Sequence, residues 1–539
     1  MPNYEQAADI LVIGAGASGA AFSWSLSQNG FNVVCLEQGY WMDPTRYPTT
    51  SRDWEYQAIT NWSFNPNIRQ RREDYPVNNE ESPISPLMFN AVGGSTIQWT
   101  AHSPRFHPSD FRVRTLDGVA DDWPLSYKDL EPFYDLNDKM MGCAGIAGDP
   151  ANPPREPRQM PPLPLGQDGL LLAKAFDSLG WHWWPSDSYI NSEPYGKDRG
   201  ACNYCGPLGL GCRQRAKAST DVTYWPLAIE NGVKLRSRAR VFEITTGDDG
   251  RVTGASYFDR YGRKRHQPAH AVALACNGIG TPRLMLLSTS DAHPDGLANS
   301  SGLLGKNLMF HPCAMATGFF ENNLQSYRGP LGSILMSQEF YETDPKHDFA
   351  RGYMLQMIRG SGPAATAIGL DGVPGRVPWG AEHHKEFVRR FGKTAGIVIL
   401  GEDLPEEQND VVLDNVLTDS HNIAAPRVRY KVNRNSRKML DHGLRMAKRV
   451  LERAGAHTIL ENPLLANAGW HLMGTARLGE NPNRSVLNPW GQAHDVDNLF
   501  VIDGSAFVTS GAVNPTPTIQ ALALRTADYI LNHRTDLRS

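Results

Sequence analysis

Residues 8–37 read ADILVIGAGASGAAFSWSLSQNGFNVVCLE. The apolar runs at 8–13 and 31–36 each predict a buried strand. Between them, the small residues of 17–28 predict a helix, and a glycine-rich turn joins the first strand to that helix. A strand, a glycine turn, a helix and a second strand in this order predict the start of a nucleotide-binding α/β domain.

The glycine turn matches the pattern G-x-G-x-x-G. Gly14 permits the tight turn, Gly16 lets the backbone approach a pyrophosphate, and Gly19 lets the helix pack on the strand. Glu37 ends the second strand, where a carboxylate accepts hydrogen bonds from a ribose diol and repels a 2′-phosphate. The turn therefore predicts an adenosine-based dinucleotide, NAD or FAD, at the positive end of the helix. The cofactor-binding residues predicted from this unit are Gly14, Gly16, Ala17, Ser18, Gly19 and Glu37.

Length and charge narrow the class of protein. A chain of 539 residues predicts two domains around a large cofactor. A formal charge of −4 gives no basic field for a nucleic acid partner. No apolar run is long enough to span a bilayer, and the first residues lack the layout of a signal peptide, so we expect a cytoplasmic protein without a membrane span. Seven cysteines, an odd number, favour reduced thiols over a disulfide framework.

Local composition and periodicity predict the main elements of the rest of the chain. Proline and glycine crowd residues 145–169, which predicts a surface connector. Alternating residues at 233–259, followed by the apolar run 270–275, predict a small β-meander that leads back into the sheet. Near the C-terminus, residues 498–503 predict a buried strand and residues 516–531 predict a helix.

Five further segments stand in the order and spacing of one known family. They are 92–96, 277–284, 305–308, 471–479 and 498–518. Over residues 8–531 the chain resembles the glucose-methanol-choline (GMC) flavoprotein oxidoreductases. Its segment 122–134 is similar to the bacterial branch that contains sugar dehydrogenases and the pyranose oxidases. The resemblance implies an α/β fold, in which a Rossmann-like FAD-binding domain carries a second, sheet-based α+β substrate-binding domain.

The same resemblance selects FAD over NAD and divides the chain. It implies an FAD-binding domain at 1–310 that is completed by 465–539, with a substrate-binding domain at 311–464. The N-terminus of the helix at 516–531 would stabilise the negative charge that a reduced flavin gains. Beyond the glycine turn, the implied cofactor-binding residues are Gly93, Gly94, Ser95, Thr96, Val241, Asn277, Asp503, Gly504, Asn514 and Thr516.

Two residues in the C-terminal part match the catalytic positions of the family. Alcohol oxidation removes a hydride from carbon and a proton from oxygen, so a base must lie within hydrogen-bond reach of the hydroxyl. The resemblance implies that His471 is this base and that the amide of Asn514 donates to the substrate oxygen. His102, His107 and His311 are interpreted as structural histidines.

One position departs from the pattern of the pyranose 2-oxidases. Those enzymes carry, after the paired glycines, a histidine that links covalently to the flavin, and this chain has Gln98 at the corresponding place. Because an amide side chain cannot form that bond, we expect non-covalent FAD.

Cys202, Cys205 and Cys212 crowd into one segment, and their thiolates could hold iron or zinc. Some sugar dehydrogenases of this family carry an iron–sulfur cluster in such a segment. Related segments place another cysteine where this chain has Leu208, beside Pro207. We therefore expect a loop without a metal, with an iron–sulfur cluster as the alternative.

The leading hypothesis is an FAD-dependent enzyme that oxidises a CH–OH group of a sugar, glycoside or polyol to a carbonyl, with hydride transfer to flavin N5. The sequence leaves the electron acceptor open between oxygen and a quinone or cytochrome. A second hypothesis is a lyase, because hydroxynitrile lyases share the scaffold and use a histidine base without net redox. A third is the catalytic subunit of a dehydrogenase complex, with a small accessory subunit, a cytochrome and co-export to the periplasm.

Overall fold

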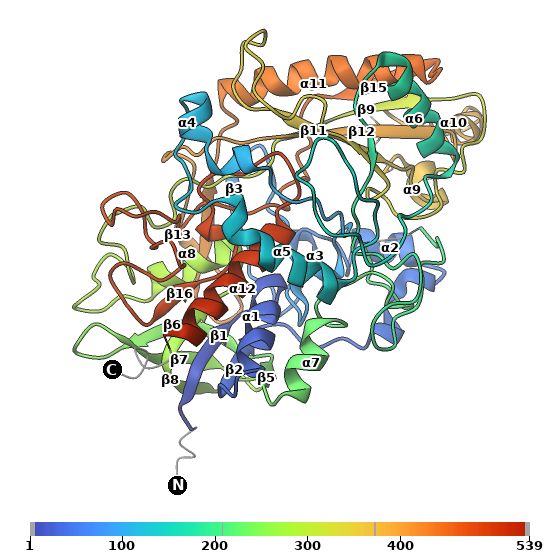
Figure 1. Ribbon diagram of the computed structural model, residues 1–539. Helices are drawn as coiled ribbons and strands as arrows, with labels where there is room; N and C mark the ends of the chain where they lie inside the picture. The colour runs from blue at the N-terminus through green and yellow to red at the C-terminus, as the bar shows by residue number, and fades with distance from the viewer. Residues whose placement is uncertain (1–5, 207–208, 371–372, 374, 534–539) are drawn as a thin grey trace.

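Two large β-sheets form the frame of the chain, and helices cover their outer faces (Figure 1). The computed structural model describes residues 6–206, 209–370, 373 and 375–533. The predicted fold class, an α/β nucleotide-binding domain joined to a second sheet-based domain, is confirmed.

The first sheet, at the bottom of Figure 1, contains the predicted nucleotide-binding unit. Its strands in spatial order are β5 (Lys234–Ser237), β2 (Val33–Glu37), β1 (Ala8–Ile13), β8 (Lys264–Leu274), β7 (Val252–Phe258) and β6 (Arg240–Thr246), and β16 (Leu499–Val501) pairs with β8. β1 and β2 are almost wholly buried, which explains their continuous apolar sequences, since parallel strands are covered on both faces. The covering helices α1 (Ala17–Ser27) and α12 (Thr516–Asn532) pack against each other.

β8 is longer than the sequence predicts because it has two different partners. Its residues 264–268 pair with β7 in antiparallel register, and residues 269–274 pair with β1 in parallel register. Only the second half is buried between covering layers and carries the apolar run. The sequence pattern therefore identifies the buried half of the strand and misses the half that belongs to the meander.

The second sheet, at the top of Figure 1, contains six strands. In spatial order they are β15 (Thr458–Asn462), β9 (Cys313–Phe319), β12 (Thr394–Gly401), β11 (Tyr353–Ile358), β10 (Leu335–Ser337) and β4 (Trp184–Pro185). The long helix α11 (Arg434–Arg453) covers one face, with α6 (Gly166–Leu179) beside it. A Cβ atom on Gly443 would lie 2.5 Å from Ile399 Cγ2, so a glycine is needed where α11 meets β12.

A third, smaller sheet and short helices complete the fold. The sheet contains β13 (Asp410–Thr418), β14 (Ala424–Arg429) and β3 (Asn78–Glu81). The remaining helices are α2 (Trp54–Ile59), α3 (Pro66–Arg69), α4 (Val113–Asp117), α5 (Tyr127–Met141), α7 (Tyr224–Glu230), α8 (Asn277–Leu287), α9 (Pro363–Ile368) and α10 (His383–Arg390). Short 3-10 turns are η1 (Pro44–Arg46), η2 (Pro48–Thr50), η3 (Gly94–Ile97), η4 (Pro108–Phe111) and η5 (Gly504–Ala506).

The division of the chain at 310 and 464 stays a proposal, and two strands cross it. β4 and β3 come from the first 310 residues, yet β4 pairs with β10 and β3 pairs with β14. The predicted connector at 145–169 also needs a correction, since α6 already begins at Gly166.

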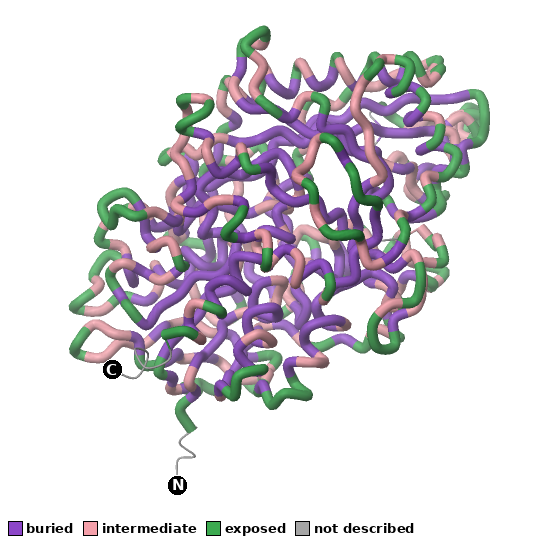
Figure 2. Tube along the Cα trace, in the orientation of Figure 1, coloured by how far each residue is buried: buried purple, intermediate pink, exposed green. Residues whose placement is uncertain are grey.

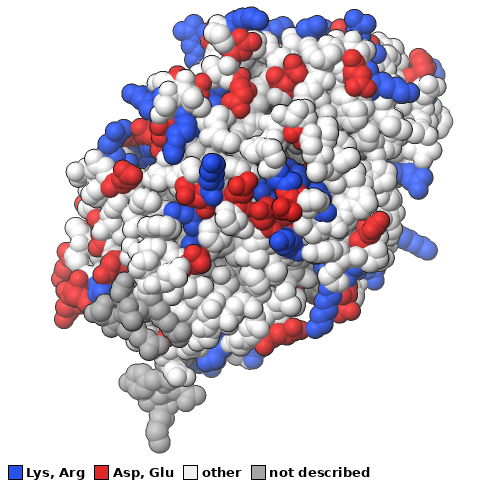
Figure 3. Space-filling model, in the orientation of Figure 1, with Lys and Arg blue, Asp and Glu red and all other residues white. Residues whose placement is uncertain are grey.

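Burial and surface charge agree with a packed interior under a mixed surface. Buried backbone runs through both large sheets, while loops and outer helix faces are exposed (Figure 2). Acidic and basic side chains are interspersed over the face shown in Figure 3. Within the described ranges, every helix is too short or too polar to cross a membrane.

Candidate active site

A cavity of about 1170 Å³ is lined by both large sheets. Its walls include the glycine turn after β1, the start of α8 and the start of α12. Side chains from the second sheet complete it, among them Met315, Gln356 and Leu400. Since pockets for a single small ligand commonly measure roughly 300 to 1,000 Å³, this cavity has room for a large cofactor and a substrate together.

The cavity brings together nearly all of the site residues predicted from the sequence. The exceptions are Gly19 and Gly93, which lie behind its wall. A Cβ atom on Gly19 would lie 2.0 Å from the carbonyl oxygen of Gly14, so this glycine serves helix packing. Gly93 has a φ of +102° and lets its turn close. The predicted residues at the wall are Gly14, Gly16, Ala17, Ser18, Glu37, Gly94, Ser95, Thr96, Val241, Asn277, His471, Asp503, Gly504, Asn514 and Thr516.

Glu37 is held at the end of β2 by backbone donors. The N–H of Ala15 donates to Glu37 Oε2 at 2.9 Å, and the N–H of Gly39 donates to Oε1 at 2.7 Å. Burial raises the pKa of Glu37 to about 7, although these two donors oppose the shift. Each carboxyl oxygen keeps a further lone pair, so the carboxyl is oriented by the protein and can still accept from a ligand.

Three buried polar atoms at the cavity wall have no partner within the described residues. They are Gln98 Oε1, Trp99 Nε1 and His102 Nε2. Buried polar atoms are normally paired, so such a group of donors and acceptors calls for a polar ligand. Elsewhere in the cavity, a Cβ atom on Gly16 would have none of the described protein atoms within 4 Å, so its backbone is open to close approach. These features fit a nucleotide with a polar ring system.

Asp503, which is predicted to bind the cofactor, lines the cavity and also joins two segments of its wall. Its carboxylate accepts hydrogen bonds from Asn277 N at 2.9 Å, Thr281 Oγ1 at 2.6 Å and Ser505 N at 2.8 Å. These bonds join the segment after β16 to the start of α8. Asp503 therefore shapes the wall by holding two segments together.

The N-terminus of α12 also meets the cavity. Thr516 and Pro517 form its first turn, and none of the side chains that the structure describes caps it. The free N–H groups and the positive end of the helix therefore suit an electron-rich group.

His471 and Asn514 both line the cavity, and each contacts a buried histidine. His471 Nδ1 lies 2.6 Å from His311 Nδ1, and Asn514 Oδ1 lies 2.8 Å from His102 Nδ1. Burial, with His311 and His102 nearby, holds the pKa of His471 well below its ordinary value. A neutral imidazole at the cavity wall can accept a proton.

His102 and His311 contact the candidate catalytic pair, and the sequence analysis does not predict these contacts. Both were interpreted as structural, because a histidine outside a recognised motif carries no signal of its own. Their partners lie far away in the sequence: 412 residues separate His102 from Asn514. In the segment that follows His471, Arg477 forms an ion pair with Asp121 at 2.7 Å.

The cysteine cluster surrounds a small pocket of about 40 Å³. Burial raises the pKa of Cys202 to about 11 and raises the pKa of Cys205, so these two side chains are thiols at neutral pH. No group of three metal-binding side chains occurs in the part of the chain that the structure describes. Leu208 and Pro207, which distinguish this segment from related ones, lie outside the described residues.

Comparison with known families gives matches to three parts of the chain. A family described as an NAD(P)-binding Rossmann-like domain matches residues 12–70. Two families described as GMC oxidoreductase match residues 186–313 and 405–523. The matched segments include the glycine turn, His471 and Asn514.

Similar proteins span the whole chain. It is 42% identical to 2-methyl-1,2-propanediol dehydrogenase of Mycolicibacterium austroafricanum, across 98% of this chain and 96% of that protein. It is 30% identical to the fructose dehydrogenase large subunit of Gluconobacter japonicus, across 99% of each chain. A solved structure of formate oxidase from Aspergillus oryzae RIB40 shares the fold, with a TM-score of 0.64, 15% identity and coverage of 99% and 100%.

Proposed function

Since the chain belongs to the GMC oxidoreductase family, we propose that His471 and Asn514 carry out its reaction, the FAD-dependent oxidation of a CH–OH group to a carbonyl. The observation that supports this pair most directly is that both residues line one cavity and that each contacts a buried histidine. The two residues come from separate loops that approach only in the folded chain.

FAD, the cofactor of this family, supplies the hydride acceptor when bound. Gly16 and the start of α1 would face its pyrophosphate, and Glu37 would accept from its ribose. The start of α12 would face the electron-rich part of the flavin. The remaining chemistry belongs to side chains at the cavity wall.

His471 takes the hydroxyl proton at Nε2 while the substrate carbon loses its hydride. The lowered pKa keeps this imidazole neutral at physiological pH, so it is ready to accept the proton. Asn514 donates from Nδ2 to the same oxygen, and this bond strengthens as negative charge grows there. One proton and one hydride leave the substrate together, which accounts for both electrons.

We propose a small polyol or sugar as the substrate. Relatives that cover the whole chain are named for a branched diol and for fructose, and both are polyhydroxy compounds. The cavity wall contributed by the second sheet mixes the aliphatic side chains of Met315, Val398 and Leu400 with the amide of Gln356. Such a wall suits a substrate with both apolar and hydroxyl-bearing parts.

An accessory subunit and a quinone or cytochrome acceptor are also proposed. Support comes from the relative that is named a large subunit. The cytoplasmic location and the alternative of export with a partner both stay predictions. Comparing oxygen, a quinone and a cytochrome as acceptors of the reduced enzyme identifies which one it uses.

Anaerobic flavin reduction tests the proposed catalytic pair. A panel of diols, sugars and sugar acids is mixed with the holoenzyme, and bleaching of the flavin is followed. His471→Ala should slow reduction by roughly 100- to 10,000-fold, the effect of a lost general base. His457→Ala, an exposed histidine, serves as the matched control. Equal rates in both variants, or substrate consumption without bleaching, would refute the assignment, and the second result would indicate lyase chemistry.

We propose that the flavin is held without a covalent bond. Gln98 Nε2 donates to the carbonyl of Trp62 at 2.7 Å, and a carboxamide offers no nucleophile for a flavin link. Acid precipitation of the holoenzyme should leave all of the yellow colour in the supernatant. Flavin that remains in the pellet after washing would overturn this proposal.

A further inference from the structure

We propose that His311 and His102 are positioning residues: His311 fixes which nitrogen of His471 carries the hydrogen, and His102 fixes which way the carboxamide of Asn514 faces. The inference rests on the proposed function, because it concerns the same catalytic pair. It gives a catalytic positioning role to two buried histidines that would otherwise have only a structural role.

Two backbone carbonyl groups determine which nitrogen of His311 carries a hydrogen. His311 Nε2 lies 2.7 Å from the carbonyl oxygen of Gly511 and 3.2 Å from that of Ser510. A carbonyl oxygen only accepts, so Nε2 of His311 must carry a hydrogen. Burial lowers the pKa of His311 to about 4, which keeps the ring neutral and leaves its Nδ1 bare.

Because Nδ1 of His311 carries no hydrogen, it determines the tautomer of His471. The two Nδ1 atoms are 2.6 Å apart, and a hydrogen bond between them needs one hydrogen. Because His311 Nδ1 has none, His471 Nδ1 must donate, and the neutral His471 ring has its free lone pair at Nε2. The described residues offer Nε2 no partner, so it is available to the substrate hydroxyl. A donor in place of His311 Nδ1 would select the wrong tautomer.

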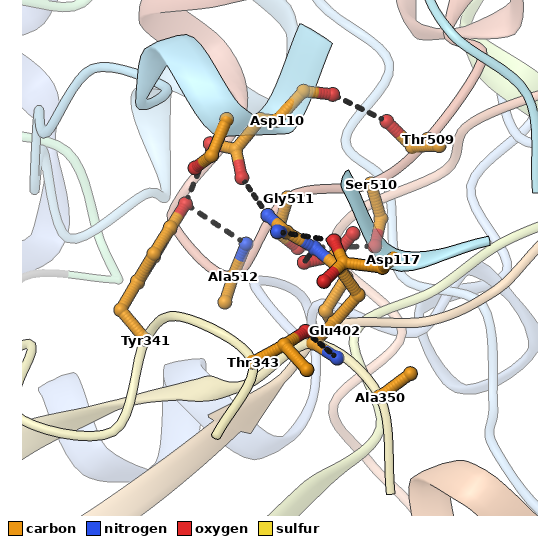
Figure 4. Close-up of polar contacts among 12 residues, drawn as sticks. Asp110, Asp117, Tyr341, Thr343, Ala350, Glu402, Thr509, Ser510, Gly511 and Ala512 are labelled. Carbon is orange, nitrogen blue, oxygen red and sulfur yellow. Dashed lines mark hydrogen bonds and ion pairs between the residues drawn. The ribbon is translucent and has the colours of Figure 1, made fainter. Parts of the chain in front are cut away.

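The segment that carries these two carbonyl groups is fixed by further hydrogen bonds. Asp403 N donates to Ser510 Oγ at 2.8 Å, and Ala512 N donates to the hydroxyl of Tyr341 at 3.2 Å (Figure 4). The same hydroxyl donates to Asp110 at 2.8 Å, and Asp110 pairs with the buried Arg351. The acceptors of His311 are therefore anchored to the second domain.

His102 contacts Asn514, the other residue of the proposed catalytic pair. Its Nδ1 lies 2.8 Å from Asn514 Oδ1, and a carboxamide oxygen only accepts, so Nδ1 must be the donor. This bond occupies Oδ1 and leaves both hydrogens of Nδ2 for the cavity, where the described chain gives them no partner. Without it, the carboxamide could turn over and present an acceptor to the substrate oxygen.

Paired substitutions test the role of His311 in the holoenzyme. Glutamine offers both an acceptor and a donor, whereas leucine offers neither. We expect His311→Leu to slow flavin reduction by about 10- to 100-fold, by analogy with hydrogen-bond partners that orient metal-bound histidines, and His311→Gln to recover most of this loss. In the His471→Ala background, His311→Leu should cause no further loss, because its effect passes through His471. Equal loss in the Leu and Gln variants, or a full additional loss in the double variant, would overturn the proposal.

Which ring nitrogen of His471 carries the hydrogen can be measured directly, without any variant at position 311. In holoenzyme with ¹⁵N-labelled histidine, the resonances of His471 are those missing from His471→Ala. We expect shifts of a ring protonated at Nδ1 and bare at Nε2, and the opposite tautomer would overturn the proposal. If His471→Ala reduces flavin normally, the proposed function fails; if only the tautomer or the His311 variants disagree, the positioning role alone fails.

The test of His102 follows the same design. His102→Gln keeps a donor for Asn514 Oδ1, and His102→Leu removes it. We expect His102→Leu to lower the rate of flavin reduction by about tenfold, with His102→Gln closer to the wild type and no added loss in an Asn514→Ala background. A loss that is independent of Asn514 would show that His102 acts elsewhere.

Discussion

Gly94 lies so close to Gly16 that a Cβ atom on Gly94 would stand 2.8 Å from Gly16 Cα. Gly94 also has a φ of +54°, a conformation that favours glycine. The two glycine turns therefore pack on each other, and together they build the end of the cavity at α1. Gly16 differs, since a Cβ atom added to it would meet no atom of the described residues within 4 Å.

Because of this difference, we expect an added methyl group to affect stability at Gly94 and FAD binding at Gly16. Gly94→Ala should destabilise the folded protein by about 1 to 3 kcal/mol, through overpacking and backbone strain. Gly16→Ala should leave the apoprotein as stable as the wild type and weaken FAD binding at least tenfold, because the methyl group projects into the cavity. Urea denaturation of the apoproteins and titration with FAD measure the two quantities. Equal destabilisation of both apoproteins would contradict this reading of the turns.

Local patterns were sufficient for elements whose neighbours are close in the sequence. The predicted strand at 8–13 matches β1, and the predicted helix at 516–531 matches α12 to within one residue. The predicted strand at 498–503 contracts to β16, because only Leu499–Val501 pair with β8. Glycine turns, apolar runs and helical periodicity report these structures directly.

Long-range contacts of single polar residues could not be predicted in this way. Nothing near His102 in the sequence indicates that its ring meets Asn514. The same holds for His311, whose partner His471 lies 160 residues away. The first half of β8 was missed for a related reason, because an exposed edge strand carries no apolar run.

The second prediction concerns Glu37 and the pH dependence of FAD binding. Burial raises the pKa of Glu37 from its ordinary 4.5 to about 7 in the free protein. A ribose hydroxyl that donates to the carboxylate favours the ionised form and lowers this pKa, so binding releases a proton. Affinity for FAD should therefore rise about tenfold from pH 6 to pH 8, measured by quenching of flavin fluorescence. Glu37→Gln should bind weakly and without this slope; a slope that persists would assign it to another group.

The third prediction concerns Arg351, which is 1% exposed and lies among four acidic side chains. Its Nε donates to Glu402 at 2.9 Å, and burial raises the pKa of Glu402 to about 8. Arg351→Met leaves these acids without their cation and should lower the free energy of unfolding by about 3 to 5 kcal/mol. Adding Glu402→Gln should restore part of that loss in urea denaturation. No recovery in the double variant would show that the packing of Arg351, not its charge, matters.

The fourth prediction concerns stability in acid. Burial lowers the pKa of His102 and of His311 from the ordinary 6.5 to about 4. Between these two pKa values, the two histidines bind protons in the unfolded chain but not in the folded protein. Their contribution to the free energy of unfolding is therefore complete above pH 6.5 and is lost as the pH drops toward 4. Each histidine should contribute about 1.4 kcal/mol per pH unit to this slope. Replacing both by glutamine should reduce the slope from pH 6.5 to 4.5 by the contribution of these two histidines, and His457→Gln should not; an unchanged slope in the double variant would assign the acid sensitivity to other groups.

The last prediction concerns Glu55, which joins α2 to α9 at the cavity wall. Its carboxylate accepts from Ala364 N at 3.0 Å and Ala365 N at 2.8 Å, so it caps a helix whose own Ncap residue, Gly362, has no side chain to do so. Losing a cap costs about 1 kcal/mol, and a negative charge at a helix N-terminus adds a few tenths more.

Glu55→Ala should therefore loosen α9 while the rest of the fold stays intact. We expect amide hydrogen exchange in 364–369 to accelerate by about five- to tenfold, the factor that corresponds to this free energy. Glu55→Gln keeps one acceptor without the charge and should show a smaller acceleration. Because Glu55 and Ala365 both line the cavity, KM for the substrate should rise with the exchange rate across the two variants. Unchanged exchange in Glu55→Ala would mean that packing against Trp54, which lies beside Gly362, holds α9 in place without this cap.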